Sequence, residues 1–171
     1  MKKLLTVTIL VVLTSYLAFG QTSAVDKLFD KYSGKEGYTS VYISKYMFNL
    51  FSTVNPEDKD LNQVVSGLSS IKILATEDKA KSVNFHNEIM KDLPIKDYKE
   101  LMVIKEKDQD LKFLVKDVEG VIVELLLIIG GSDNALICIQ GDNINLKNIS
   151  NLSKSMKIEG LENLEKMNDK K

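Results

Sequence analysis

The chain has 171 residues, with 23 basic residues, 24 acidic residues and one histidine, and its net charge is −1. All the basic residues are lysine, and without arginine or a basic excess the composition argues against nucleic-acid binding. Cys138 is the only cysteine, so no disulfide can form within the chain, and stability must come from packing alone.

The N-terminus has the layout of a secretory signal peptide. Lys2 and Lys3 give a cationic start, an apolar run extends from Leu4 to Phe19, and small residues precede Gln21. We expect cleavage before Gln21, which removes residues 1–20, with cleavage before Val25 as the second candidate. A retained membrane anchor is the alternative, because the apolar run approaches the roughly 20 residues that span a bilayer.

Cleavage would leave a soluble exported protein, periplasmic or secreted. A lipoprotein would carry a cysteine at the cleavage point, and Cys138 lies far from it. Without Lys2 and Lys3, 21 lysines remain against 24 acidic residues, which is a net charge of −3. Residues 21–156 suffice for a single domain with its own core, and residues 157–171 are expected to form a polar, flexible tail.

The first half of the mature chain predicts helices that alternate with short strands. Apolar spacing indicates a helix over 25–32, a strand over 38–43, and a second helix that Ser44 caps. A third helix is expected to start at Asn55-Pro56-Glu57-Asp58 and to bury residues up to Leu68. A strand over 71–75 then precedes a longer helix, which Thr76 caps and Pro94 ends.

The second half predicts four strands separated by tight polar breaks. They cover 101–105, 111–116, 121–129 and 135–140, and such short breaks favour an antiparallel meander. In 111–116, apolar residues alternate with lysines around Leu114, which indicates one buried and one exposed face. The strand 121–129 has only Glu124 as a polar interruption, so we expect it to be central and covered on both faces.

A last core helix is expected to begin at Asn145 and to bury Leu146, Ile149, Leu152 and Met156. The pattern as a whole predicts an α+β fold. Its one mixed, mainly antiparallel sheet has about six strands, including the C-terminal four-strand meander, and packs with about four helices.

No group of residues has the spacing of a catalytic or metal site. His86 is the only histidine, and without a Cys or His cluster we expect a structural role for it on its helix. Cys138 lies on an apolar strand, where we expect a buried small hydrophobic residue and no nucleophile. We predict no catalytic residue, no metal ligand and no cofactor.

Acidic and glycine-rich stretches fit structural roles. The acidic residues lack the ligand order of a calcium loop and fit helix starts and hairpin tips. They are Glu57, Asp58, Asp60, Asp108, Asp110, Asp133 and Asp142. Gly130-Gly131-Ser132 lacks the glycine spacing and the lysine of a phosphate-binding loop, so we expect a turn.

Aromatic residues gather in one part of the chain, at Tyr38, Tyr42, Tyr46, Phe48 and Phe51. They are dense enough to line a groove, but their spacing favours core packing for most of them.

Several stretches occur in a characteristic order: 29–34 (FDKYSG), 41–47 (VYISKYM), 71–74 (IKIL), 100–102 (ELM) and 139–142 (IQGD), followed by the predicted Asn145 helix. Over nearly the whole mature chain this order resembles the family called domain of unknown function 4252, small exported proteins of Bacteroidetes-type bacteria. The resemblance implies a bacterial envelope setting. Genes of this family often neighbour those of extracytoplasmic sigma-factor systems, which implies a regulatory or stress role. The family has no assigned activity, so the resemblance implies no functional residues in this chain.

We therefore expect a non-enzymatic exported protein that binds an as yet unidentified protein partner, in envelope signalling or stress response. The alternative is a periplasmic small-ligand carrier or weak hydrolase with a pocket between sheet and helices. A large apolar pocket with converging polar groups would favour that alternative.

Overall fold

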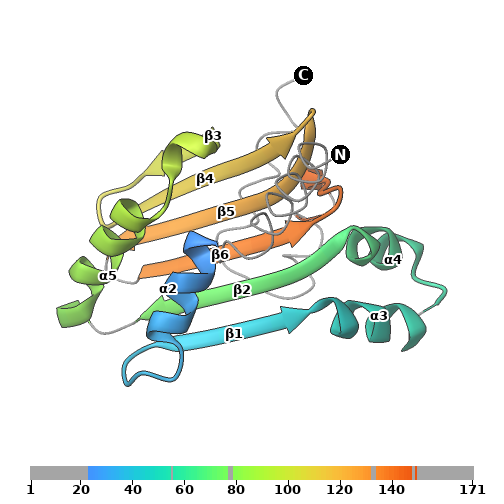
Figure 1. Cartoon of the computed structure of the whole chain (residues 1–171), viewed down its shortest axis with the longest axis horizontal. Helices are drawn as coiled ribbons and strands as arrows, with labels where there is room; N and C mark the ends of the chain where they lie inside the picture. The colour runs from blue at the N-terminus through green and yellow to red at the C-terminus, as the bar shows by residue number, and fades with distance from the viewer. Residues whose placement is uncertain (1–22, 55, 77–78, 132–133, 148, 150–171) are drawn as a thin grey trace, which may run out of the picture.

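The computed structural model describes residues 23–54, 56–76, 79–131, 134–147 and 149. Six antiparallel strands form one sheet in the order β1-β2-β6-β5-β4-β3 (Figure 1). The strands are β1 (Thr39–Ser44), β2 (Leu68–Thr76), β3 (Lys99–Lys105), β4 (Gln109–Val118), β5 (Val121–Gly131) and β6 (Asn134–Gly141). Strands β3 to β6 form the expected meander, and the chain crosses from β2 to the far edge at β3.

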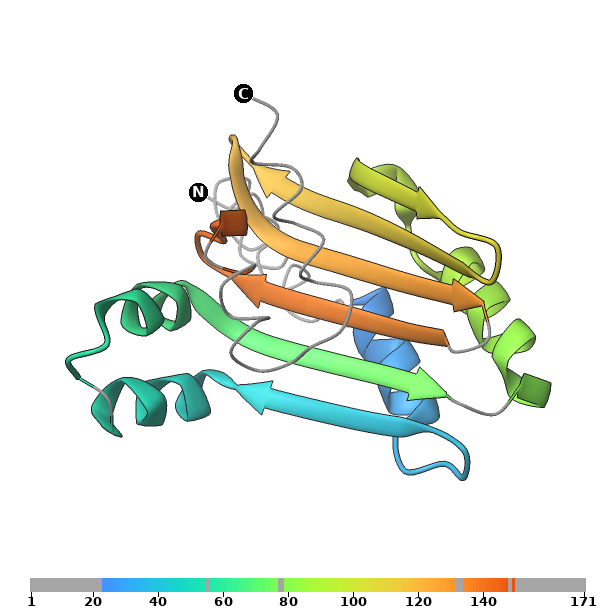
Figure 2. The ribbon, with the colours of Figure 1, turned by 180° about the vertical axis from the view of Figure 1, so that it is seen from behind.

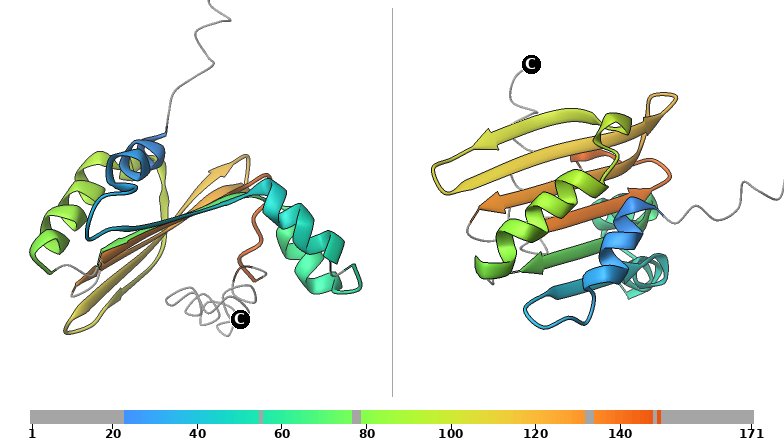
Figure 3. Two further views of the ribbon diagram at one scale, coloured as in Figure 1. Left: turned by 90° about the horizontal axis from the view of Figure 1, so that it is seen from below. Right: turned by 60° about the vertical axis from the view of Figure 1, so that its left-hand side comes forward.

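Helices lie on both sides of this sheet. α2 (Ala24–Tyr32) and α5 (Lys79–Asp92) cover one face, and α5 makes the crossing to β3. α3 (Lys45–Val54) and α4 (Lys59–Ser66) form a helical pair past the ends of β1 and β2 (Figure 2). Seen along the sheet, this pair turns toward the face opposite α2 and α5 (Figure 3). A short 3-10 helix, η2 (Ile95–Asp97), precedes β3.

Two apolar cores result, one on each face, because side chains of a strand alternate between faces. The α2–α5 core consists of Val25, Leu28, Tyr32, Leu74, Phe85, Ile89, Leu93, Leu114, Leu126, Ile128, Leu136 and Cys138. On the other face, Phe48 of α3 and Val64 and Val65 of α4 pack with the opposite core of the sheet. From β5, Leu125 and Leu127 join that opposite core, while Leu126 joins the α2–α5 core. The prediction of a central strand covered on both faces is confirmed.

The α+β fold class is confirmed, and the differences are local. The sheet is antiparallel throughout instead of mixed. Leu114 is buried in the α2–α5 core, so β4 is covered on both faces there.

One helix start differs from the prediction. Asp58 caps α4 by accepting the Leu61 N–H at 2.9 Å, so the helix begins after the Asn55-Pro56 start that we expected. Leu68 belongs to β2 and not to that helix. Thr76 ends β2 and donates to the Gly37 carbonyl at 2.7 Å. Residues 77–78, which connect it to α5, lie outside the described residues, so its predicted role as a cap stays a prediction.

Some expectations fall outside the described residues. They are the signal peptide 1–20, the inward residues Leu152 and Met156, and the tail 157–171. Asn145 does start a helical turn, because its side chain accepts the Lys147 N–H at 3.0 Å. Within the described part of the chain, no helix is both long enough and apolar enough to cross a membrane.

The start of β2 and the end of β6 meet at two glycines. The Asp142 N–H donates to the Gly67 carbonyl at 3.0 Å. A Cβ at Gly141 would overlap that same carbonyl oxygen, which is rigid backbone. The close approach therefore requires glycine at 141, for reasons of space.

We predict that Gly141→Ala destabilises the protein by about 2–3 kcal/mol, because the added methyl forces two paired strands apart. Gly120→Ala is the matched control, since its Cβ would meet open space and only its positive φ of 86° opposes alanine. That control should cost about 1 kcal/mol. The measurement is urea denaturation, and an equal loss in both variants would contradict the steric argument.

Candidate functional site

Exposed apolar side chains concentrate on β1 and α3. Seven of the ten large apolar side chains that the described residues leave exposed lie there. On β1 they are Val41 and Tyr42. On α3 they are Tyr46, Met47, Leu50, Phe51 and Val54, which we call the α3 stripe. Tyr46 and Val54 are 71% and 73% exposed, far more than core side chains. Gathered exposure of this kind marks interaction surfaces.

The α3 stripe results from how the helix sits on the sheet. At 3.6 residues per turn, the five stripe residues fall within an arc of about 140°, and Phe48 lies beside that arc. Phe48 is 1% exposed in the opposite core. Phe48 is thus the residue of α3 that is buried in the core, and the five stripe residues face outward.

The expectation that most clustered aromatic residues are core is wrong. Phe48 is buried, and Tyr38 packs against Tyr32 and Phe85 with ring centroids 4.6 and 5.6 Å away. Tyr42, Tyr46 and Phe51 are exposed instead. The sequence did contain a signal for this exposure: the apolar side of α3 is too wide for all of its residues to pack in the core.

A buried polar network crosses the face that carries α2 and α5. Glu124 of β5 is 8% exposed. It accepts from the Tyr98 hydroxyl at 2.7 Å and from the Gln140 amide at 3.3 Å, and Ser70 donates to Gln140 at 3.0 Å. A buried carboxylate needs such donors. Burial first, and the bond to Glu124 second, raise the pKa of Tyr98, so its hydroxyl stays protonated as a donor.

These residues belong to a row that runs straight across the sheet. Ser44, Ser70, Gln140, Glu124 and Lys116 face one another in turn on β1, β2, β6, β5 and β4. Sequence reasoning treated Glu124 only as an interruption of an apolar strand. Its partners could not be found from spacing, because Tyr98 is 26 residues away.

Cys138 lies beside this network and is buried, as predicted. Burial first, and the charge of Glu124 second, raise the pKa of its thiol well above the usual value. A thiol that resists ionisation is a poor nucleophile. The structure therefore places the cysteine in the α2–α5 core with the chemistry of a small hydrophobic residue.

One ion pair joins α2 to the sheet. The Lys72 ammonium donates to Asp26, and it also lies 5.8 Å from the centre of the Tyr42 ring. Burial acts to raise the pKa of Asp26, but the hydrogen bonds from Lys72 and Ser23 outweigh it, so the net pKa is lowered. Asp26 therefore favours its ionised form in the folded protein more than in the unfolded chain.

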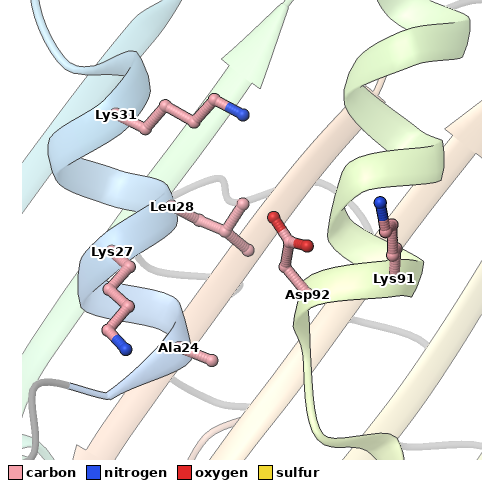
Figure 4. A pocket seen from close by; sticks show the side chains of 6 residues that line it. All are labelled: Ala24, Lys27, Leu28, Lys31, Lys91 and Asp92. Carbon is pink, nitrogen blue, oxygen red and sulfur yellow. The ribbon is translucent and has the colours of Figure 1, made fainter.

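An open groove of about 440 Å³ separates α2 from α5. It is lined by Ala24, Lys27, Leu28, Lys31, Lys91 and Asp92. Figure 4 shows Leu28 and Asp92 pointing toward each other between the helices, with Lys31 reaching from α2 toward α5. Lys31 is paired with Glu88, which also accepts from the Tyr32 hydroxyl. The groove is mainly cationic, and one of its three lysines is already occupied.

The other residues singled out from the sequence, which are the histidine, the acidic residues and the glycines, have contacts that explain them as parts of the fold. The ring of His86 lies against Gly130, where a Cβ would come within 2.6 Å of it, so the glycine makes room for the histidine. Asp58 caps α4, and Asp142 pairs with Lys45 at 3.6 Å. The expected turn at Gly130-Gly131 is wrong, because these glycines are the last two residues of β5 and pair with Asp110 and Gln109 of β4. Among the described residues, no three His, Cys, Asp or Glu side chains are grouped as metal ligands would be.

We predict that Tyr98→Phe lowers the free energy of unfolding by about 2 kcal/mol, because it removes a hydrogen bond to a buried carboxylate. Tyr46→Phe makes the same chemical change on an exposed ring and should cost less than about 0.5 kcal/mol. Urea denaturation of both variants at neutral pH measures the difference. If Tyr98→Phe were as stable as the control, the network would not hold Glu124 as described.

We predict that Asp26→Asn costs about 1 kcal/mol at neutral pH, a modest value because the Asp26 side chain is partly exposed. Since the folded pKa lies below the usual 3.8, this stabilisation is present above that value and is lost as the pH falls below it. The stability curves of the two proteins should therefore converge as the pH falls below 3.8. Asp30→Asn, on the exposed side of α2, is the control, and a difference that persisted in acid would refute the ion-pair contribution.

Comparison with known proteins gives one finding. No curated protein and no solved structure gives a significant match to this chain. Residues 32–152, which include β1 to β6 and α3 to α5, match the sequence profile described as domain of unknown function (DUF4252). The match covers well over half of the chain, and it includes the α3 stripe and the Glu124 network. The chain therefore belongs to the DUF4252 family.

Proposed function

We propose that this chain is an exported, non-enzymatic protein of the bacterial envelope that binds a protein partner through the α3 stripe. The observation that carries the proposal is the set of five exposed apolar side chains on one ten-residue helix. Regulation of an envelope signalling or stress response is the setting that we propose for this binding.

The chemistry of α3 favours a protein partner with an apolar groove. Tyr46, Leu50 and Val54 follow one another at intervals of four residues, the spacing by which a helix fills such a groove. Tyr46 and Phe51 supply the aromatic anchors that dominate many interfaces. A helix that lies on a membrane surface typically carries several lysines on its polar side. α3 has only Lys45, at its first position.

Binding at the stripe would not require the core to open. Phe48 holds α3 to the sheet from the margin of the apolar side, and α4 packs beside it. The stripe is therefore presented by a supported helix, which reduces the ordering cost of association. A partner would bury side chains that now contact water, and that burial is the main source of affinity.

The alternative function, small-ligand carriage, would use the groove between α2 and α5. Its three lysines would select an anion, but Asp92 opposes that charge and Lys31 is paired with Glu88. The apolar lining is limited to Ala24 and Leu28. The α3 stripe is thus the better-supported site.

We predict that a photo-crosslinking amino acid placed at Tyr46 or Leu50 captures a specific protein in the periplasmic fraction of cells that naturally carry the gene. The same probe at Asn49 should not, because this residue lies on the polar side of α3, outside the arc of the stripe. The captured protein, once purified, should bind the wild-type chain at least tenfold more tightly than Leu50→Glu, since a charge in an apolar groove is strongly unfavourable.

Circular dichroism and urea denaturation must show that Leu50→Glu folds normally. Equal capture from both sides of α3, or unchanged binding by Leu50→Glu, would refute the proposal. Capture of lipid instead of protein would assign the stripe to a membrane surface and would equally overturn it.

A further inference from the structure

The face of the sheet opposite α2 and α5 carries an apolar surface that the described helices cover only in part. Side chains of β4, β5 and β6 on this face are 0–9% exposed and belong to the opposite core. They are Leu111, Phe113, Val115, Leu125, Leu127, Ile129, Ile137 and Ile139. α3 packs mainly on β1 and β2, and α4 packs on α3. Figure 2, which views the sheet from this side, shows both helices past the strand ends, with α2 and α5 behind the sheet.

The chain that follows β6 begins to cover this surface. The Ile144 N–H donates to the Ile122 carbonyl at 2.8 Å, which holds the chain against β5. Ile144 and Ile149 are 4% and 1% exposed, and both belong to the opposite core. Between them, the Ile149 N–H donates to the Asn145 carbonyl at 3.0 Å, the bond of one helical turn. The chain therefore reaches this face as the first turn of a helix.

Ile144 and Ile149 are too small to cover the whole surface. Neighbouring strands lie about 4.8 Å apart, so β4, β5 and β6 together span about 10 Å. Along β5, the distance from Leu125 to Ile129 is about 13 Å. An α-helix with its side chains is about 10 Å wide. One helix of two or three turns would therefore cover these strands, and a single turn would not.

We propose that residues 150–156 cover this face by continuing the helical turn that starts at Asn145. Ile149, Leu152 and Met156 follow one another at i, i+3 and i+7, which places them on one side of a helix. From Ile149 to Met156 a helix advances about 10 Å, which is the width of the three strands. Asn151 falls on the other side of the same helix, toward water. The proposal goes beyond the proposed function, because it concerns the opposite core and not the α3 stripe.

The point of attachment favours this segment over the N-terminal one. Residues 1–22 also lie outside the described part of the chain, but they lead into α2. Val25 and Leu28 of α2 already pack in the α2–α5 core, on the other face of the sheet. Ile149, in contrast, is buried in the opposite core directly before residue 150. The expected cleavage before Gln21 would also remove residues 1–20, whereas residues 150–156 stay with the mature chain.

A cover that the chain itself supplies has a consequence for binding. It fills the apolar face of β4, β5 and β6, so a foreign protein or an apolar ligand has no access there. The α3 stripe, which lies past the end of the sheet, is left exposed. The two apolar surfaces of the opposite side would thus have different fates, one closed within the chain and one available to a partner.

Leu152→Asp in the chain from Gln21 to Lys171 tests the proposal. It should lower the urea midpoint by about 1 M or more and raise the fluorescence of the apolar dye ANS at least about threefold, because a carboxylate cannot stay on the apolar face. Asn151→Asp is the matched control, since it adds the same charge on the proposed polar side, and it should shift the midpoint by less than about 0.3 M. Equal shifts in both variants, or no shift in either, would overturn the proposal.

A truncation tests the extent of the cover. Removing residues 157–171 should shift the urea midpoint by less than about 0.3 M, because the proposed cover ends at Met156. Removing residues 150–171 should raise ANS fluorescence as Leu152→Asp does. A large loss of stability in the shorter truncation, or normal stability in the longer one, would overturn the assignment to residues 150–156.

A diazirine analogue of leucine at position 152 locates the segment without disturbing the fold. Mass spectrometry should find crosslinks to peptides of β4, β5 or β6 within the same chain, and the same probe at Asn151 should give none. Crosslinks between two chains would assign the face to a second copy, and crosslinks to α2 or α5 would place the segment on the other face. Either result, or no crosslink to the sheet, would overturn the proposal, and none of them bears on capture of a partner through Leu50.

Discussion

The rest of the structure depends on two central strands, β5 and β6, which are apolar on both faces. Such strands cannot leave either face to water without a large loss of hydrophobic stabilisation. One cover is formed by α2 and α5. On the other side, α3 and α4 pack at the ends of β1 and β2, and the chain after β6 returns to the sheet, where Ile144 donates its N–H to the Ile122 carbonyl at 2.8 Å. α5 therefore has two roles: it connects β2 to β3, and it covers one apolar face of the sheet.

Glu124 is the only charged residue within these two strands, and it adds specificity that apolar residues cannot supply. Apolar side chains tolerate a shift of pairing by two residues better than a buried carboxylate does. A slip by one residue would move Glu124 from Tyr98 and Gln140 into the opposite core. A slip by two would separate it from the same donors. The polar row across the sheet thus favours one register, while the leucines and isoleucines around it supply most of the stability.

The sequence pattern correctly predicted those features of the fold that depend on residues close together in the chain. The strand over 121–129, the burial of Cys138 and the end of α5 before Pro94 all follow from composition or from a single breaking residue. Long-range contacts lay beyond such reasoning: Asp26 meets Lys72 across 46 residues, and Tyr98 meets Glu124 across 26. Thr76 shows the same limit, since its hydroxyl donates to the Gly37 carbonyl, 39 residues away.

The candidate surface was harder to predict for a different reason. A helical pattern gives the arc of apolar residues but not the part of that arc that meets the core. For α3, the connection from Ser44 directly into the helix fixes the rotation, so Phe48 turns inward and Tyr46 turns outward. Because β1 ends at Ser44 and α3 begins at Lys45 without a linker, the direction in which the stripe faces follows from the position of β1 at the edge of the sheet.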